Sequence, residues 1–157
     1  MKVGRLVLQV ADRSQLGTRG AGSRPYGVGL LVVGADQTGP HLYETQPSGQ
    51  YFEYLGMAIG ARSQAGRTYL EKHFEEFAEL PLEQLITHAV IALRETLGSG
   101  TELSAANVAV GFVGGDKKFT ILEDESVQPY IDAVKKPDEA PAAAAAGDGD
   151  AAMDTGS

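Results

Sequence analysis

The chain has 157 residues, 43% of them hydrophobic, and this length and composition suit one domain with a real core. It contains no cysteine, which excludes disulfides, thiolate zinc sites and cysteine nucleophiles and gives no reason to expect a secreted protein. The formal charge is −8, and five of the acidic residues lie in 137–157, so the charge of residues 1–136 is nearly balanced. The sequence has no stripe of basic residues that would favour nucleic-acid binding. It also has no apolar run of membrane-spanning length.

Residues 3–16 predict an amphipathic helix, because apolar residues recur at helical spacing. These residues are Val3, Leu6, Val7, Val10 and Ala11. Met1 and Lys2 offer no capping side chain, so we expect the beginning of this helix to be missing. The glycine-rich stretch Gly17–Gly27 predicts an irregular turn region.

An antiparallel β region is predicted next, from short apolar runs bounded by turn residues. The runs are Tyr26–Val33, His41–Thr45, Tyr51–Leu55 and a fourth segment, Met57–Ile59, that leads to Gly60. Residues 34–40 form the turn of the first hairpin. Both alternating sets of residues in 28–33 are apolar or small, which predicts a strand buried on both faces. Helices from the rest of the chain can cover only one face, so we expect an incomplete fold or one completed by a partner.

Two helices follow, at residues 61–77 and 80–98, where apolar residues keep helical spacing. Ser63 is a candidate N-cap of the first helix. Pro81 suits the first turn of the second helix, and Gly98 suits its C′ position. A join of about three residues predicts that the helices form an antiparallel pair.

The remaining residues predict a second hairpin and a short helix. Val108–Val113 and Phe119–Leu122 flank a Gly-Gly-Asp-Lys turn, and residues 126–136 place apolar residues on one helical face. The acidic run 123–125 is expected to stabilise the start of that helix through the helix dipole. Residues 137–157 are acidic and rich in alanine and glycine, which predicts a disordered, solvated spacer, with a docking or regulatory tail as the alternative.

No motif in the sequence indicates catalysis or cofactor binding. Residues 20–25 begin like a dinucleotide-binding loop, but Pro25 replaces the third glycine and the loop precedes a strand. His41, His73 and His88 lack metal-ligand spacing, and the two on the paired helices are interpreted as boundary residues. We therefore expect no catalytic residue, no cofactor and no metal.

The stretch Gly56–Phe74 places a glycine-broken apolar segment against the start of an arginine-bearing helix. Such a helix N-terminus, with Arg62 and Arg67 nearby, is able to attract an anion. Glu71 lies at i+4 from Arg67, however, and is a nearer partner than a ligand. We interpret both arginines as structural or interface residues.

Three segments together resemble the α-type subunits of the proteasome core particle, above all the type-1 members of the sixth α-ring position, in wording close to plant and green-algal versions. They are residues 24–31 (RPYGVGLL), 47–52 (PSGQYF) and 59–71 (IGARSQAGRTYLE). The resemblance runs from about Val3 to Lys136. Residues 1–136 are therefore expected to form a partial α-type domain and 137–157 a tail.

The resemblance implies an α+β fold, the αββα sandwich of N-terminal-nucleophile hydrolases, truncated to roughly its C-terminal half. The paired helices would form one outer layer, and a second sheet would cover the other face of the doubly apolar strand. Gly60 would give room where a sheet edge turns onto its covering helix, with Ser63 as the cap. The residues expected to be structural are Arg24, Pro25, Gly27, Gly60, Arg62, Ser63 and Arg67.

The resemblance also implies a function. α-Type subunits lack the N-terminal threonine nucleophile of active β-type relatives, so we expect a noncatalytic structural subunit of the α-ring that supports ubiquitin-dependent protein degradation in the cytoplasm and nucleus. Its partners would be neighbouring α-type subunits and the β-ring, without nucleic acid or membrane. The alternatives are an unprocessed hydrolase with Thr18, in the glycine-rich turn, as nucleophile, or a truncated fragment without independent function.

Overall fold

The computed structural model describes residues 2–98, 100–115 and 117–134 as a mixed α and β chain. The helices are α1 (Val3–Arg19), α2 (Ser63–His73), α3 (Leu82–Glu95) and α4 (Gln128–Val134), with a 3-10 turn, η1 (Asp124–Ser126). The strands are β1 (Leu30–Asp36), β2 (Gly39–Thr45), β3 (Tyr51–Glu53), β4 (Val110–Gly114) and β5 (Lys117–Leu122). Strands β1–β2–β3 make one antiparallel sheet and β4–β5 a second. Within these residues we find no helix with the length and apolar character that a membrane crossing requires.

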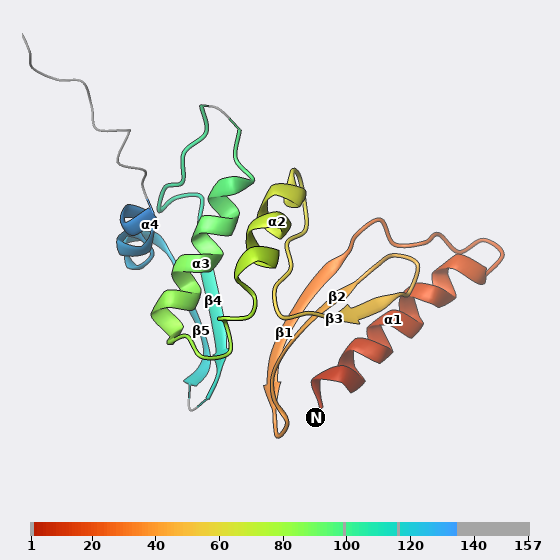
Figure 1. The fold of residues 1–157 in the computed structure, drawn as a ribbon. Coiled ribbons are helices and arrows are strands. Elements are labelled where there is room, and N and C mark those ends of the chain that lie inside the picture. The colour runs from red at the N-terminus through yellow and green to blue at the C-terminus, as the bar shows by residue number, and fades with distance from the viewer. Residues whose placement is uncertain (1, 99, 116, 135–157) are drawn as a thin grey trace, which may run out of the picture.

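Helix α1 lies along one side of the β1–β2–β3 sheet, and α2, α3, the second sheet and α4 lie on the other side (Figure 1). The predicted amphipathic helix is confirmed, since Val3, Val7 and Ala11 are buried on one face of α1. Gly34 of β1 lets the helix approach the strand, because a Cβ there would lie 2.7 Å from Cγ2 of Val3. The helix continues to Arg19, three residues beyond the predicted end.

The first turn of α1 has a cap that the local sequence does not contain. Lys2 precedes the helix in an extended conformation (φ −70°, ψ 137°) and makes no side-chain capping bond. Oδ2 of Asp36, at the end of β1, accepts the Val3 N–H at 2.9 Å. A carboxylate there satisfies an unpaired helical N–H and complements the helix dipole. The prediction that no local side chain caps the helix is confirmed for Lys2, and the capping carboxylate comes from a distant residue instead.

The first hairpin is shifted relative to the prediction. β1 pairs with β2 from Leu30 opposite Thr45 to Asp36 opposite Gly39, which leaves only residues 37–38 in the loop. The predicted strand at 26–33 and turn at 34–40 were therefore wrong in position. The side chain of Asp36 accepts the Thr38 N–H at 2.8 Å and so closes a tight turn that lengthens both strands. β3 is shorter than predicted, and Met57–Ile59 is not a strand.

Strand β1 carries apolar side chains on both of its faces. α1 packs on the face of Leu30, Val32 and Gly34, and Leu31 and Val33 lie on the opposite face. Leu30 keeps 40% of its surface exposed and Val33 keeps 59%. The predicted burial of both faces is therefore not reached within the described residues, and apolar surface stays open on each side of the strand.

Helices α2 and α3 pack against each other as predicted, but their ends differ from the prediction. α2 ends at His73, so residues 74–81 join the helices instead of about three residues. The cap of α3 is Thr96, whose N–H bonds to the carbonyls of Leu93 and Arg94. Gly98 lies beyond the C′ position and is outside the left-handed region, so its predicted C′ role is wrong.

A core forms where α3, the second sheet and α4 meet. Its buried residues are Ile86, Val90, Val108, Val127, Ile131 and Val134. The predicted second hairpin is confirmed, and so is the final helix, which holds Pro129 in its first turn. The predictions for 137–157 concern residues outside those that the structure describes.

Replacement of Val127 by alanine should lower the free energy of unfolding by about 1.5–3 kcal/mol, because this side chain is 0% exposed in the core. Replacement of Val28, which is 58% exposed, should cost less than about 0.5 kcal/mol. Urea unfolding followed by circular dichroism measures both values. Equal costs for the two substitutions would contradict this location of the core.

Candidate functional site

The predicted junction at Gly56–Phe74 joins α2 to the loop before it and to the end of α3. Arg62 is the residue before α2 and has a left-handed conformation (φ 55°), with no side-chain capping bond. Ser63 is the first helical residue, so its predicted role as N-cap is wrong. Nε–H of Arg67 donates to the Ala58 carbonyl at 2.7 Å. Among the described residues no ion pair joins Arg67 to Glu71, so the expected partner was also wrong.

Glycines allow close packing throughout this junction. A Cβ at Gly66 of α2 would lie 3.0 Å from the Ala92 carbonyl of α3 and 3.1 Å from Cγ2 of Thr96. A Cβ at Gly98 would overlap the guanidinium of Arg62. Arg62 and Arg67 therefore lie against main chain at the start of α2, and their contacts hold α2, the preceding loop and the end of α3 together.

The other residues expected to be structural lie apart from this junction or act differently. Gly60 adopts φ 101°, and a Cβ there would meet nothing within 4 Å. Its glycine therefore serves a left-handed backbone, and the expected need for room at a sheet edge was wrong. The backbone of Arg24 and Pro25 packs against Gly17 near the end of α1. A Cβ built on Gly17 would lie 3.3 Å from the Arg24 carbonyl. Gly27 has open space around it.

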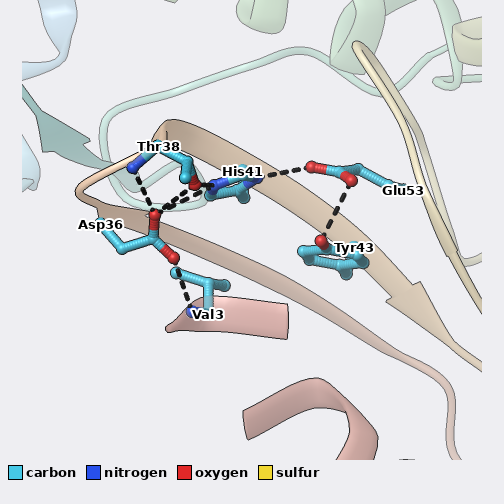
Figure 2. A network of polar contacts seen from close by, with 6 residues as sticks. All are labelled: Val3, Asp36, Thr38, His41, Tyr43 and Glu53. Carbon is cyan, nitrogen blue, oxygen red and sulfur yellow. Dashed lines mark hydrogen bonds and ion pairs between the residues drawn. The ribbon is translucent and has the colours of Figure 1, made fainter. Parts of the chain in front are cut away.

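A polar network that the sequence analysis missed lies where α1 meets the first sheet (Figure 2). We call it the His41 cluster; its side chains are those of Asp36, Thr38, His41, Tyr43 and Glu53. Nδ1 of His41 lies 2.5 Å from Oε1 of Glu53, and Nε2 lies 2.8 Å from Oγ1 of Thr38 and 3.3 Å from Oδ1 of Asp36. Thr38 donates its hydroxyl to Oδ1 of Asp36 at 2.5 Å, and Tyr43 donates to Oε2 of Glu53 at 3.0 Å.

The hydrogen-bond geometry assigns a proton to each ring nitrogen of His41. The Thr38 hydroxyl uses its one hydrogen on Asp36, so it accepts a hydrogen bond from Nε2 of His41. The carboxylate of Glu53 also accepts, so Nδ1 must donate as well. An imidazole that donates from both nitrogens is the charged imidazolium.

The pKa directions agree with this assignment. The hydrogen bond to Glu53, and then the carboxylate of Asp36, raise the pKa of His41 above its ordinary 6.5. The hydrogen bonds from His41 and then Tyr43 lower the pKa of Glu53. Bonds from the Thr38 side chain and backbone, and from the Val3 N–H, hold the pKa of Asp36 well below its usual range. Burial and the bond to Glu53 raise the pKa of Tyr43.

Two sequence signals could have located the His41 cluster. Asp36-Gln37-Thr38 has the spacing of an Asx turn, in which the aspartate accepts the N–H two residues on. His41 and Tyr43 alternate on one face of β2, and the pairing of Tyr43 with Glu53 brings the carboxylate to the same face. The misplaced turn at 34–40 hid both signals.

His73 and His88 belong to a ring cluster between α2 and α3. Their ring centroids lie 5.4 Å apart, and Tyr69 lies 4.7 Å from His73. Oη of Tyr69 lies 2.9 Å from Nδ1 of His88, and burial raises the pKa of Tyr69. Both histidines are half-buried, in agreement with their interpretation as boundary residues. In the described part of the chain we find no group of three His, Cys, Asp or Glu side chains placed to hold a metal ion.

An apolar groove of about 400 Å³ lies between the first sheet and the helix pair. Leu31 and Leu42 of the sheet, Leu70 of α2 and Leu85 and Ala89 of α3 contribute to its lining. The groove continues the open face of β1 that carries Leu31 and Val33. Its lining is mainly apolar, as expected of packing surface.

Comparison with known proteins identifies the family. The sequence model of the family described as "Proteasome subunit" matches residues 1–113. The chain is 53% identical over 132 residues to proteasome subunit alpha type-1 of Dictyostelium discoideum, across 83% of this chain and 53% of that protein. It is 45% identical over 144 residues to probable proteasome subunit alpha type-6 of Schizosaccharomyces pombe, across 92% of this chain and 52% of that protein. The chain belongs to the proteasome subunit family.

Within this family the relatives are α-type subunits, so the resemblance seen in the sequence is confirmed. Proteasome subunit alpha type-1 of Drosophila melanogaster is 37% identical over 139 residues, which are 87% of this chain and 50% of that protein. The chain therefore spans about half the length of the curated proteasome subunits that it matches. The junction at α2 lies inside the matched region, as do all the residues expected to be structural.

Replacement of Gly66 by valine should destabilise this proteasome-family chain by about 1–3 kcal/mol, because the added atoms would press on the α3 backbone. Ala65→Val, at the adjacent exposed position, should cost only roughly 0.5 kcal/mol through helix propensity. Thermal or urea unfolding measures the difference. If both variants unfold alike, the close contact of α2 with α3 is not made.

The imidazole of His41 should titrate at a higher pH in the folded chain than in the urea-unfolded chain, because Glu53 and Asp36 favour its charged form. A raised pKa means that its contribution to stability is complete below about pH 6.5 and is lost as the pH rises through the folded value. NMR titration of the ring resonances measures both midpoints. Glu53→Gln should move the folded midpoint downward; an unchanged midpoint would refute the charge-assisted contact.

Proposed function

We propose that the chain acts as a noncatalytic structural subunit of the α-ring of the proteasome core particle. The observation that carries this proposal is the family match of residues 1–113, together with α-type relatives up to 53% identical. In this role it supports ubiquitin-dependent protein degradation in the cytoplasm and nucleus. Its domain covers residues 1–136, and 137–157 form a separate tail.

The open apolar faces of the first sheet support an assembly role. Leu31 and Val33 of β1 share the face away from α1 with Phe52 of β3, whose side chain is 48% exposed. Exposed apolar surface of this kind marks sites of contact with other layers or chains. We propose that this face is covered by the facing sheet of a complete αββα sandwich. The partners in this proposal are neighbouring α-type subunits and the β-ring.

In this proposal, the residues expected to be structural hold particular elements in place. Arg62 and Arg67 hold the start of α2 against the preceding loop and the end of α3, and Gly60 supplies the left-handed bend that the loop requires. Arg24 and Pro25 fix the segment that leads from α1 to the sheet. Together these contacts order the helix pair with the loop before it, and the segment between α1 and the sheet.

An unprocessed N-terminal-nucleophile hydrolase is the alternative from another class, with Thr18 as its early candidate nucleophile. Thr18 lies in the last turn of α1, so its expected place in an irregular turn was wrong. Its hydroxyl donates to the Gln15 carbonyl at 2.7 Å, and a nucleophile of this class needs its own free amine beside the hydroxyl. The contacts of Thr18 are those of an ordinary helical threonine.

A truncated fragment without independent function is the third candidate. The open faces of β1 favour it, whereas the buried core of α3, the second sheet and α4 opposes it. A sharp, cooperative thermal transition of the isolated chain, followed by circular dichroism, would count against it.

The proposal is tested by native fractionation of cells that produce the tagged chain, with intact masses measured for the tagged species. We expect the tag in a large particle that also contains α-type and β-type proteasome subunits. Recovery only as a free chain would overturn the subunit assignment. Peptide hydrolysis by the purified chain that is abolished by Thr18→Ala would instead support the hydrolase alternative.

A matched pair of variants distinguishes specific assembly from adventitious association. Val33→Glu places a carboxylate on the open sheet face, and Gln37→Glu places the same group in the exposed turn of the same hairpin. We expect Val33→Glu to lose incorporation into the particle and Gln37→Glu to retain it. Equal incorporation of the two variants would refute the covered face.

A further inference from the structure

We propose that the His41 cluster is a proton-linked clasp that holds the first turn of α1 on the β1–β2–β3 sheet. In the protonated state, His41 ties β3 to the hairpin turn and, through Asp36, to the start of α1. Loss of one proton breaks a contact in this chain of bonds and loosens the docking of α1. This inference concerns the fold itself and does not depend on assembly.

The clasp follows from the count of donors and acceptors around His41. Glu53 presents a carboxylate to Nδ1, and Thr38 presents an oxygen whose hydrogen is already used on Asp36. A neutral imidazole donates from one nitrogen and accepts at the other. It must therefore either face the Glu53 carboxylate with a lone pair or draw the Thr38 hydroxyl away from Asp36.

Asp36 connects the protonation state of His41 to the start of α1. Its Oδ1 receives the Thr38 hydroxyl, the Thr38 N–H and the Nε2 contact of His41, while its Oδ2 receives the Val3 N–H (Figure 2). The Asp36 carboxylate that caps α1 is thus the same carboxylate that interacts with the charge of His41. Rotation of Thr38, or loss of the imidazolium charge, removes part of what holds this carboxylate in place.

The described charged groups around His41 have the arrangement that the clasp requires. Asp36 comes from β1, Tyr43 from β2 and Glu53 from β3, and both carboxylates favour the imidazolium. At the start of α1 the charged residues are Lys2, which precedes the helix, and Arg5 within it; neither makes an ion pair with the cluster among the described residues. β4 approaches the hairpin at Ala35 and Pro40, on the opposite face, and Lys117 beyond it lies 5.7 Å over the Phe112 ring.

Hydrogen exchange of the purified 157-residue chain, read by mass spectrometry between pH 6 and 9, tests the clasp. The reporter peptide is the start of α1, and the internal control is the α3 peptide, which lies outside the cluster. After correction for the intrinsic pH dependence of exchange, we expect α1 protection to fall as the pH rises through the folded His41 pKa, by at most about tenfold for each pH unit by which that pKa exceeds 6.5. The α3 peptide should show no such transition.

Two variants separate the clasp from a merely structural contact. His41→Gln keeps a hydrogen-bonding side chain but cannot take up the proton, so its α1 peptide should lose the transition. His88→Gln makes the same substitution at a histidine between α2 and α3, outside the cluster, so it should keep the transition. If His41→Gln is too unstable to compare, the wild-type α1 transition must coincide with the NMR titration midpoint of His41. A wild-type α1 peptide without a transition, a transition that persists in His41→Gln, or midpoints that differ would each overturn the proposal.

Discussion

The two apolar faces of β1 impose the constraint on which the rest of the structure depends. Alternate residues of a strand point to opposite faces, so a strand with Leu30 and Val32 on one face and Leu31 and Val33 on the other needs a layer on each side. α1 supplies one layer, at Val3, Val7 and Ala11. The helix pair reaches the other side only as far as the apolar groove at Leu31 and Leu42. The second face stays open among the described residues, and we propose that a further layer of an assembly covers it.

The docking of α1 depends on polar contacts as well as apolar ones. Its buried residues are small, and the cap of its first turn is borrowed from Asp36 on the sheet. That carboxylate is in turn held by Thr38 and His41, so the polar residues of the hairpin and the apolar stripe of α1 secure the same interface. At the other end of the molecule, Val90 and Val127 are buried in the apolar core beside α3 and α4, and Arg94 of α3 also donates to the Val134 carbonyl of α4.

Much of the element order could be predicted from the sequence, because it depends on local periodicity. The stripe of α1, the second hairpin and the helix with Pro129 follow from spacing alone. Two of the failures involve contacts between distant residues. Asp36 as the cap of α1, and Gly98 as the space for Arg62, are invisible to local patterns because their partners lie more than thirty residues away. The shift of the first hairpin has a local cause instead, because the side chain of Asp36 bonds to the N–H of Thr38 two residues on and closes a tighter turn than predicted.

The candidate site also has parts that could be anticipated from the sequence and parts that could not. The arginine-bearing junction at α2 was interpreted from the sequence as structural, but the contacts of its arginines with the Ala58 carbonyl and with Gly98 could not be predicted. The His41 cluster was missed because its members come from three strands whose register was not known. Spacing along the chain indicated no common role for the three histidines, and the fold places His41 in a polar network apart from the other two. The network therefore depends on tertiary structure and not on a motif.

Hydroxyl-radical footprinting of the open sheet face tests the central claim most directly. Phe52 and Leu31 should react readily in the free chain, where they are 48% and 36% exposed, and should be protected when the chain is part of a proteasome particle. Labelling of each residue is quantified by mass spectrometry in the two states. Equal labelling in both states would contradict the account, because the face that β1 leaves open would then not be covered in the particle.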